Sequence, residues 1–202
     1  MANVILHLPA ERYEAFIFDC DGTLVDSMPL HFEAWRRALT ESGATFEFTW
    51  QLFTSRAGMG LPQTVHALNE QFHTRLDADV VIKRQQSIYF GLLDKLQSIA
   101  VVEQLARKVA SSSPVSVASG GGRVHVMRSL VVTGMDSLFP VVVTQDDVTR
   151  GKPDPQMFLL AAERMGVQAQ QCLVVEDSTL GLQAAEAAGM GAAWVEHVAP
   201  PV

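Results

Sequence analysis

The residues best suited to chemistry in this sequence are two aspartates separated by a single residue, in the segment Phe18-Asp19-Cys20-Asp21-Gly22-Thr23. They follow a short apolar run, Ala15–Phe18, that is typical of a buried strand. In a turn at the end of such a strand, both carboxylates can point into the crevice above a sheet. Asp19 and Asp21 then suit divided roles, one as a nucleophile and the other as a general acid and base. Gly22 permits the turn. The alternative is an ordinary Asp-Gly turn with solvated acids.

A second polar group follows another apolar run. Ser119 comes after Val115–Ala118 and leads into Gly120-Gly121-Gly122 and a helical pattern. A hydroxyl beside free backbone N–H groups at the start of a helix can bind an anion. A plain Ser/Gly helix cap is the alternative.

Charged residues also follow two further apolar runs. Lys152 follows Val141–Thr144, and the prolines around it predict a rigidly held ammonium rather than a solvated one. Glu176 and Asp177 follow Leu173–Val175, and their hard carboxylate oxygens suit Mg²⁺, although they could equally cap a helix.

The elements that must position these groups are short strands without polar alternation, separated by helical patterns. Such runs predict parallel strands buried on both faces. We therefore expect an α/β fold with a doubly wound, Rossmann-like parallel sheet. The expected strands are 15–18, 115–118, 141–144, 173–175 and 192–195, and the expected helices between them are 124–132, 155–165 and 179–188.

One interval carries helical patterns only. Between residues 27 and 98 we expect helices at 28–42, 62–72 and 78–96, with no strand. This predicts an inserted helical cap at 27–98, within an α/β core formed by 1–26 and 99–202.

Composition narrows the class of protein. The 202 residues are 48% apolar and 18% charged, which excludes a disordered, collagen-like or coiled-coil chain. The 15 basic and 22 acidic residues give a net charge of −7 without a basic cluster, so we expect no nucleic acid and no membrane as a partner. No apolar run is long enough to span a bilayer, and the N-terminal stretch is a poor signal peptide, which favours a soluble cytoplasmic protein. Cys20 and Cys172 form no metal or disulfide pattern.

Taken together, the four groups of polar residues that follow the predicted strands resemble the motifs of the haloacid dehalogenase superfamily of phosphotransferases, over nearly the whole chain. Asp19-x-Asp21-Gly-Thr resembles that family's first motif, Ser119 its second, Lys152 its third, and Glu176-Asp177 its fourth. The helical insertion resembles the family's C1 cap. Residues 181–185 and 188–190 resemble the β-phosphoglucomutase-like branch, and 164–167 and 171–172 resemble its bacterial fructose-1-phosphate and 6-phosphogluconate phosphatases.

The resemblance implies a Mg²⁺-dependent phosphatase that hydrolyses small phosphorylated metabolites, such as sugar phosphates, through an aspartyl-phosphate. Asp19 would attack phosphorus, and Asp21 would protonate the leaving alkoxide and then deprotonate water. The implied phosphate ligands are Lys152, Ser119 and the N–H groups of Cys20 and Gly120, with His31 facing the substrate. The implied Mg²⁺ ligands are Asp19, the Asp21 backbone carbonyl, Glu176 and Asp177. We expect a small phosphorylated molecule as the partner and a monomeric enzyme.

Two alternatives remain open. A β-phosphoglucomutase-type phosphohexomutase normally needs a cap arginine for a second phosphate. Aligned on Gly58, that position falls at Leu61, although Arg56 or Arg75 could substitute. His31 matches the cap histidine of mutase-like members, or is a surface histidine. The other alternative is a non-catalytic member that binds a phosphorylated ligand or a protein. Asp21 argues against hydrolytic dehalogenation, whose branch lacks the second aspartate.

Overall fold

The computed structural model describes residues 3–56 and 59–198, and its contacts divide the chain into two compact units. One unit is Met1–Asp26 with Gln97–Val202, and the other is Ser27–Leu96. The chain leaves the first unit after Asp26 and returns at Gln97, whose carbonyl accepts a 2.9 Å hydrogen bond from Asp26 N. A second bond, from Ile99 N to Leu24 O, ties the same two segments together.

The first unit is built on a six-stranded sheet in the order β1-β6-β5-β2-β3-β4. Its strands are β1 (Asn3–His7), β2 (Ala15–Phe18), β3 (Val115–Ser119), β4 (Val141–Thr144), β5 (Cys172–Glu176) and β6 (Gly191–Val198). The pairs among β2 to β6 are all parallel, as predicted, because each strand is reached through a helical crossover. The expected α/β, doubly wound fold is therefore confirmed.

One strand of this sheet was not predicted. β1 pairs antiparallel with β6, with His7 opposite Trp194, so the sheet is mixed rather than wholly parallel. β1 includes the polar His7, ends before Pro9 and lies at the edge of the sheet. An edge strand is paired on one side only, so it tolerates polar residues and a proline at its end.

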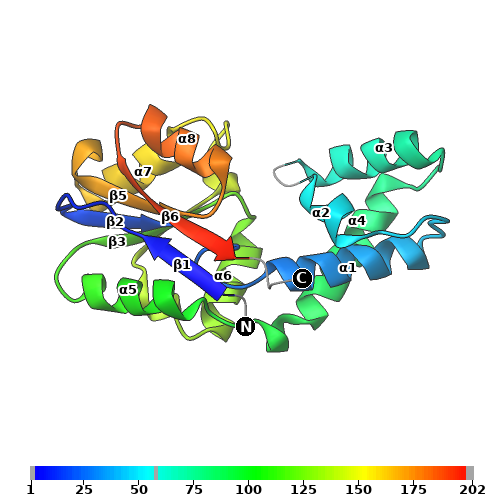
Figure 1. Ribbon diagram of the computed structural model, residues 1–202, viewed down its shortest axis with the longest axis horizontal. Coiled ribbons are helices and arrows are strands. Elements are labelled where there is room, and N and C mark those ends of the chain that lie inside the picture. The colour runs from blue at the N-terminus through cyan, green and yellow to red at the C-terminus, as the bar shows by residue number, and fades with distance from the viewer. Residues whose placement is uncertain (1–2, 57–58, 199–202) are drawn as a thin grey trace. The chain divides into compact units, whose positions relative to one another are not determined.

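Helices cover both faces of this sheet. The helices α7 (Gln156–Met165) and α8 (Thr179–Ala187) pack on one face of the sheet (Figure 1). Ile17, Val174 and Phe158 are fully buried in the core on that face. The helices α5 (Ala100–Ala110) and α6 (Arg123–Val132) complete the unit, and α5 was not predicted. Short 3-10 helices occupy Asp136–Leu138, Gln145–Asp147 and Ala169–Gln171.

The register of the sheet brings the ends of four strands to one edge. Phe18 lies opposite both Val117 and Val175, Ser119 lies opposite Thr144, and Glu176 lies opposite Trp194. Because the strands are parallel, the residues that follow them emerge together at the carboxyl edge of the sheet.

The second unit, Ser27–Leu96, is wholly helical over its described residues. Its helices are α1 (Met28–Glu41), α2 (Trp50–Thr54), α3 (Leu61–Phe72) and α4 (Ala78–Gly91), followed by a 3-10 turn at Leu93–Lys95. A core around Trp35, Leu39, Val65 and Leu68 joins them. The five-residue α2 was not predicted, because so short a helix shows no periodicity.

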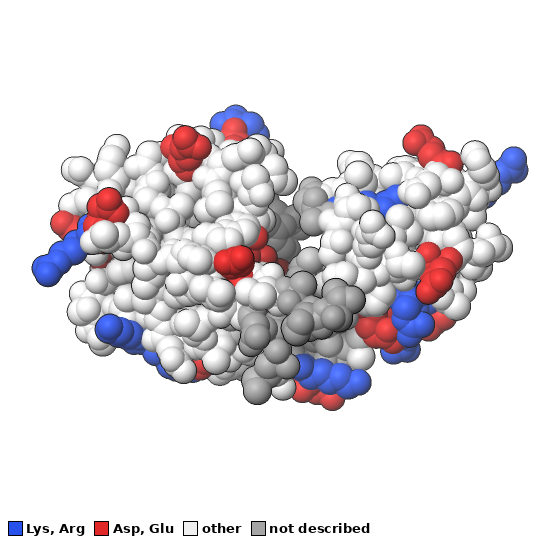
Figure 2. Space-filling model, viewed as in Figure 1, with Lys and Arg blue, Asp and Glu red and all other residues white. Residues whose placement is uncertain are grey.

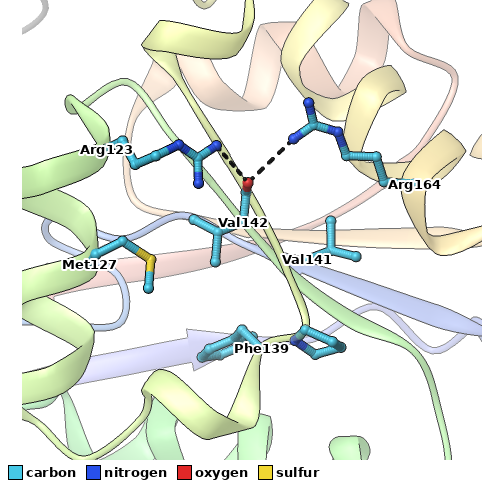
Figure 3. A pocket seen from close by; sticks show the side chains of 7 residues that line it. Arg123, Met127, Phe139, Val141, Val142 and Arg164 are labelled. Carbon is cyan, nitrogen blue, oxygen red and sulfur yellow. Dashed lines mark hydrogen bonds between the residues drawn. The ribbon is translucent and has the colours of Figure 1, made fainter.

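Two arginines converge on the edge strand β4 in the first unit. Arg123 of α6 and Arg164 of α7 each donate to the carbonyl oxygen of Val142, at 3.3 and 3.4 Å, beside a pocket that also contains Met127 and Phe139 (Figure 3). Both guanidinium groups also pair with Asp147, at 2.6 and 3.1 Å. Asp147 therefore connects β4 to the helices on either side of it.

The pKa of Asp147 reflects this position. Burial alone would raise it, but hydrogen bonds from the Thr144 backbone, Arg164 and the Thr144 hydroxyl, together with the charge of Arg123, lower the pKa to about 2. A carboxylate whose pKa falls on folding stabilises the native state above its unfolded pKa, which is about 4. That stabilisation is lost as the pH falls from about 4 towards 2.

We predict that Asp147→Asn lowers the free energy of unfolding at pH 7 by about 1–2 kcal/mol, because the ion pairs to both arginines are lost. The difference from the wild type should shrink as the pH falls from 4 to 2, and urea unfolding at each pH measures it. Asp136→Asn, at an exposed site, serves as the control and should cost less than about 0.5 kcal/mol. A difference that stays constant down to pH 2 would contradict the prediction.

Candidate active site

The loop after β2 is held in shape by its own backbone. Asp19 N donates to Val175 O at 3.0 Å, and the carbonyl of Cys20 accepts from Leu24 N and Val25 N. Gly22 has φ +85°, which an L side chain rarely adopts. A Cβ at Gly22 would also lie 2.3 Å from Asp177 Oδ2, so glycine lets this turn pass directly beneath the Asp177 carboxylate.

Lys152 joins the ends of β2 and β5. Its Nζ lies 2.6 Å from Asp19 Oδ1 and 2.8 Å from Glu176 Oε1. All three side chains are nearly inaccessible, with exposed fractions of 10%, 9% and 1%. Nζ also lies 5.0 Å from the centre of the Phe158 ring, a cation–π contact. A lysine buried among carboxylates in this way is fixed as a point charge above the sheet.

The loop that carries Lys152 is itself anchored at both ends. The side-chain oxygen of Gln156 accepts hydrogen bonds from Thr149 N and Arg150 N, and Asp154 Oδ1 accepts one from Gln156 N. These bonds fix the path of the chain between β4 and α7, in addition to the prolines around Lys152.

Burial and charge set the protonation of this group. Burial raises the pKa of Asp19 well above its usual range, and the charge of Lys152 opposes that rise. For Lys152, burial alone would lower the pKa, but the carboxylates of Asp19 and Glu176 raise it above its ordinary value. Burial and the charge of Glu176 raise the pKa of Asp177 to about 6, against a hydrogen bond from Thr23. The site holds more negative charge than one lysine neutralises.

Glu176 uses both of its oxygens within the protein. Oε1 accepts from Lys152, and Oε2 accepts from Ser178 N. Asp177 is held by Thr23 Oγ1 at 2.8 Å, and His197 Nε2 lies 3.8 Å from its other oxygen. Thr23 and His197 were not predicted as site residues. Thr23 lies within the aspartate motif, but nothing in the sequence places β6, and hence His197, beside that loop.

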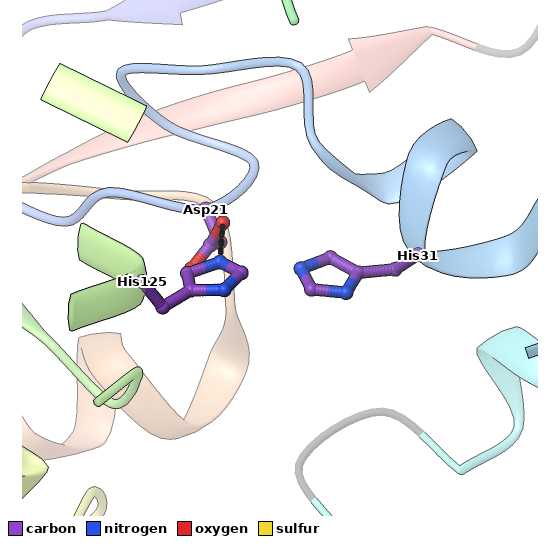
Figure 4. A group of neighbouring side chains, drawn as sticks. All are labelled: Asp21, His31 and His125. Carbon is purple, nitrogen blue, oxygen red and sulfur yellow. Dashed lines mark hydrogen bonds and ion pairs between the residues drawn. The ribbon is translucent and has the colours of Figure 1, made fainter. Parts of the chain in front are cut away.

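Asp21 and Ser119 form a second group of polar side chains around Gly121. Ser119 Oγ accepts from Gly121 N at 3.0 Å, and a Cβ at Gly121 would lie 3.4 Å from both Ser119 Oγ and Asp21 Oδ2. His125 of α6, also not predicted, places Nε2 3.3 Å from Asp21 Oδ1 (Figure 4). The structure therefore brings Asp19, Asp21, Ser119, Lys152, Glu176 and Asp177 to one edge of one sheet.

Cys20 lies in the same loop but is chemically inert. Its thiol is fully buried, and burial raises its pKa well above the usual range, with Asp21 and Asp19 adding to the rise. Because the thiolate is the nucleophilic form, this rise disfavours a role for Cys20 as a cysteine nucleophile. Within residues 3–56 and 59–198, no backbone carbonyl outside the helices and strands accepts from the N–H of Cys20 or of Gly120.

The candidate residues of the helical unit lie within its own packing. His31 stacks on Tyr89, with ring centroids 4.1 Å apart. Leu61 packs against the core of this unit, and Arg56 donates to Leu52 O and to the Gln71 side chain. Gly58, the reference for the mutase alignment, lies outside the described residues.

Charged side chains of both signs are mixed on the face of the molecule drawn in Figure 2. On the face drawn in Figure 2, Lys and Arg side chains lie scattered among acidic and neutral ones rather than in one patch. Within the described residues, no helix has the length and apolar character needed to span a membrane.

Comparison with known proteins agrees with this geometry. The model of the haloacid dehalogenase-like hydrolase family matches residues 13–189. Fructose-1-phosphate phosphatase YqaB of Escherichia coli is 34% identical over 183 residues, which cover 90% of this chain and 96% of that protein. The 6-phosphogluconate phosphatase of the same organism is 30% identical, covering 89% of this chain and 80% of that protein.

Comparison with solved structures agrees with the comparison of sequences. The crystal structure of a putative beta-phosphoglucomutase from Thermotoga maritima superposes with a TM-score of 0.73 at 30% identity, covering 88% of this chain and 82% of the other. The resemblance inferred from the motifs is thus confirmed over most of the sequence. The chain belongs to the haloacid dehalogenase-like hydrolase family, and it is a phosphatase of that family.

Proposed function

We propose that this enzyme is a Mg²⁺-dependent cytoplasmic phosphatase that hydrolyses small phosphorylated metabolites, sugar phosphates above all, through a phosphorylated Asp19. The observation that carries the proposal is the buried contact of Lys152 with Asp19 and Glu176, beside Asp177. It provides a fixed nucleophile and a fixed positive charge at one point. The sugar phosphatases among the relatives support the substrate class, and two buried free cysteines suit a reducing compartment.

The residues present fit a magnesium ion. Asp19, Glu176 and Asp177 carry three negative charges when ionised, whereas Lys152 supplies one positive charge. Hard carboxylate oxygens are the donors that Mg²⁺ prefers. Asp19, Asp177 and the backbone carbonyl of Asp21 would hold the ion, and Glu176, whose oxygens are engaged by Lys152 and Ser178, would chiefly position Lys152. When bound, the metal would neutralise the carboxylates and the phosphate charge.

The chain's own residues then divide the reaction between them. Asp19 attacks phosphorus, and the bond from phosphorus to the ester oxygen breaks while Asp21 gives that oxygen a proton. Asp21, now ionised, takes a proton from water as the water oxygen attacks phosphorus. The bond between Asp19 and phosphorus then breaks, and inorganic phosphate leaves. Lys152, Ser119 and the N–H groups of Cys20 and Gly120 bind the phosphate oxygens throughout.

We propose that the helical unit, with bounds 27–98, acts as a cap. Features of this unit favour hydrolysis over phosphohexomutase activity. A mutase must hold a second phosphate. The aligned position is the apolar Leu61, and Arg56 already donates within its own unit. We propose His31 as a substrate contact of this cap. A non-catalytic binding protein, the remaining alternative, would bind a phosphosugar without turning it over.

We predict metal-dependent phosphate release from a panel containing fructose 1-phosphate, 6-phosphogluconate and β-glucose 1-phosphate. Removal of divalent ions with a chelator should lower the rate by at least about 10³-fold, because the clustered carboxylates would repel the substrate. Added Mg²⁺ should restore activity. Formation of glucose 6-phosphate from β-glucose 1-phosphate without phosphate release would instead establish a mutase, and saturable binding without any product would establish a binding protein.

We predict that Asp19→Asn reduces turnover by at least about 10⁴-fold, because an amide cannot form the covalent intermediate. Steady-state phosphate release measures the loss, and capture of a phosphorylated wild-type chain by mass spectrometry after rapid quenching identifies the modified residue. Asp26→Asn, in the same segment but outside the motif, is the matched control. Near-normal rates in Asp19→Asn would exclude the covalent route.

The position of Glu176 depends on Gly181 in the first turn of α8. A Cβ at Gly181 would lie 1.8 Å from Glu176 Oε1, and that carboxylate cannot yield easily because Lys152 and Ser178 hold it. Glycine is therefore required here by close approach, not by its backbone angle.

We predict that Gly181→Ala destabilises the fold by about 1–3 kcal/mol and lowers kcat/KM by about 10–100-fold, since Glu176 must move away from Lys152. Gly91→Ala is the matched control, because nothing lies within 4 Å of a Cβ at Gly91. That control should leave both urea unfolding and kcat/KM close to the wild type. Equal behaviour of the two variants would show that Glu176 is free to shift without cost.

A further inference from the structure

His125 lies in the first turn of α6, outside the chemistry proposed above. Its Nε2 lies 3.3 Å from Asp21 Oδ1 (Figure 4). The two side chains are mostly buried, with exposed fractions of 18% and 22%. The contact joins α6 to the loop after β2, which lies 104 residues away along the chain. No motif contains His125, and the reaction scheme above does not use it.

The two oxygens of Asp21 have different surroundings. Oδ1 faces the imidazole of His125, whereas Oδ2 lies 3.4 Å from the point that a Cβ on Gly121 would occupy. Ser119 Oγ lies 3.4 Å from that same point. Oδ2 is thus directed towards the loop of Ser119 and Gly121, which would bind the phosphate. Because Gly121 has no side chain, the space between Asp21 Oδ2 and Ser119 Oγ stays open.

Rotation about the bond between Cβ and Cγ would exchange the two oxygens of an unrestrained aspartate, because this torsion is broad and nearly two-fold. A hydrogen bond to one oxygen removes that freedom. Held in this way, the carboxyl group presents a defined oxygen, and a general acid requires its proton within hydrogen-bond reach of the leaving oxygen. A small displacement of such a group can cost a large factor in rate.

We propose that His125 is a positioning residue for the general acid: its Nε2–H donates to Asp21 Oδ1 and holds Oδ2 towards the leaving group of the substrate. The inference rests on the proposed function. In the first step the proton passes from Oδ2 to the ester oxygen as the bond to phosphorus breaks. In the second, Asp21 recovers a proton from the attacking water. His125 keeps its own proton throughout, so it positions Asp21 and exchanges nothing.

The test uses the leaving group as the readout. An alkoxide leaving from fructose 1-phosphate needs a proton, whereas p-nitrophenolate leaving from p-nitrophenyl phosphate is stable without one. Because kcat/KM reports the steps up to departure of the leaving group, the loss of a well-placed acid lowers it selectively for the sugar phosphate. A general loss of folding or of phosphate binding lowers kcat/KM for both substrates alike.

We expect His125→Phe, which keeps a ring and removes the donor, to lower kcat/KM for fructose 1-phosphate by about 10–100-fold and for p-nitrophenyl phosphate by less than about 3-fold. His125→Gln, whose amide places a donor near the position of Nε2, should recover most of the loss. Asp21→Asn should show the same selectivity with a larger factor. His7→Phe, on the edge strand β1, is the histidine control and should match the wild type.

The outcomes separate the inference from the proposed function. No hydrolysis of either substrate by the wild type, or no selective loss in Asp21→Asn, would overturn the proposed function. A selective loss in Asp21→Asn, together with equal losses or none in His125→Phe, would overturn the role of His125 alone. If His125→Phe does not fold, His125→Met replaces it. In the wild-type chain, ¹⁵N NMR of His125 must also show the Nε2–H tautomer, and the Nδ1–H tautomer would overturn the proposal.

Discussion

The structure of the first unit depends on a buried ammonium group shared between two carboxylates. Lys152 reaches Asp19 at the end of β2 and Glu176 at the end of β5, which are neighbouring strands with a fixed parallel register. Removing one partner of a buried pair leaves an uncompensated charge, which typically costs about 3–5 kcal/mol. The same contact that orders the carboxyl edge of the sheet therefore also opposes the rise that burial causes in the pKa of Asp19.

Two aspartates of one motif obtain different properties from their surroundings. Asp19 is nearly inaccessible and lies against Lys152, so its charge is compensated. Asp21 is more exposed, lies against His125, and faces the serine and glycine loop. One carboxylate next to a cation and one away from it is the arrangement that separates a nucleophile from an acid. The turn at Gly22 follows both aspartates, and its positive φ lets the chain pass close to the Asp177 carboxylate.

Much of this could be predicted from the sequence, for identifiable reasons. Strands such as Ala15–Phe18 are short apolar runs followed at once by polar residues, so both the strand and its functional end are visible locally. β1 and α2 were missed because an edge strand with polar residues and a five-residue helix carry little periodicity. His125 and His197 were missed for another reason. Each meets the aspartate loop only through tertiary packing, and neither spacing nor residue type announces such a contact.

The two arginines that donate to β4 have a consequence for contacts between copies of this protein. An edge strand presents unpaired backbone groups to which another chain can add a strand, the first step towards sheet-mediated aggregation. On β4 the carbonyl of Val142 already accepts from Arg123 and Arg164, and Asp147 holds both guanidinium groups in place. An incoming strand would have to displace two charged side chains to reach that acceptor. The ion pairs that connect β4 to its neighbouring helices therefore also hinder strand pairing between molecules at this edge of the sheet.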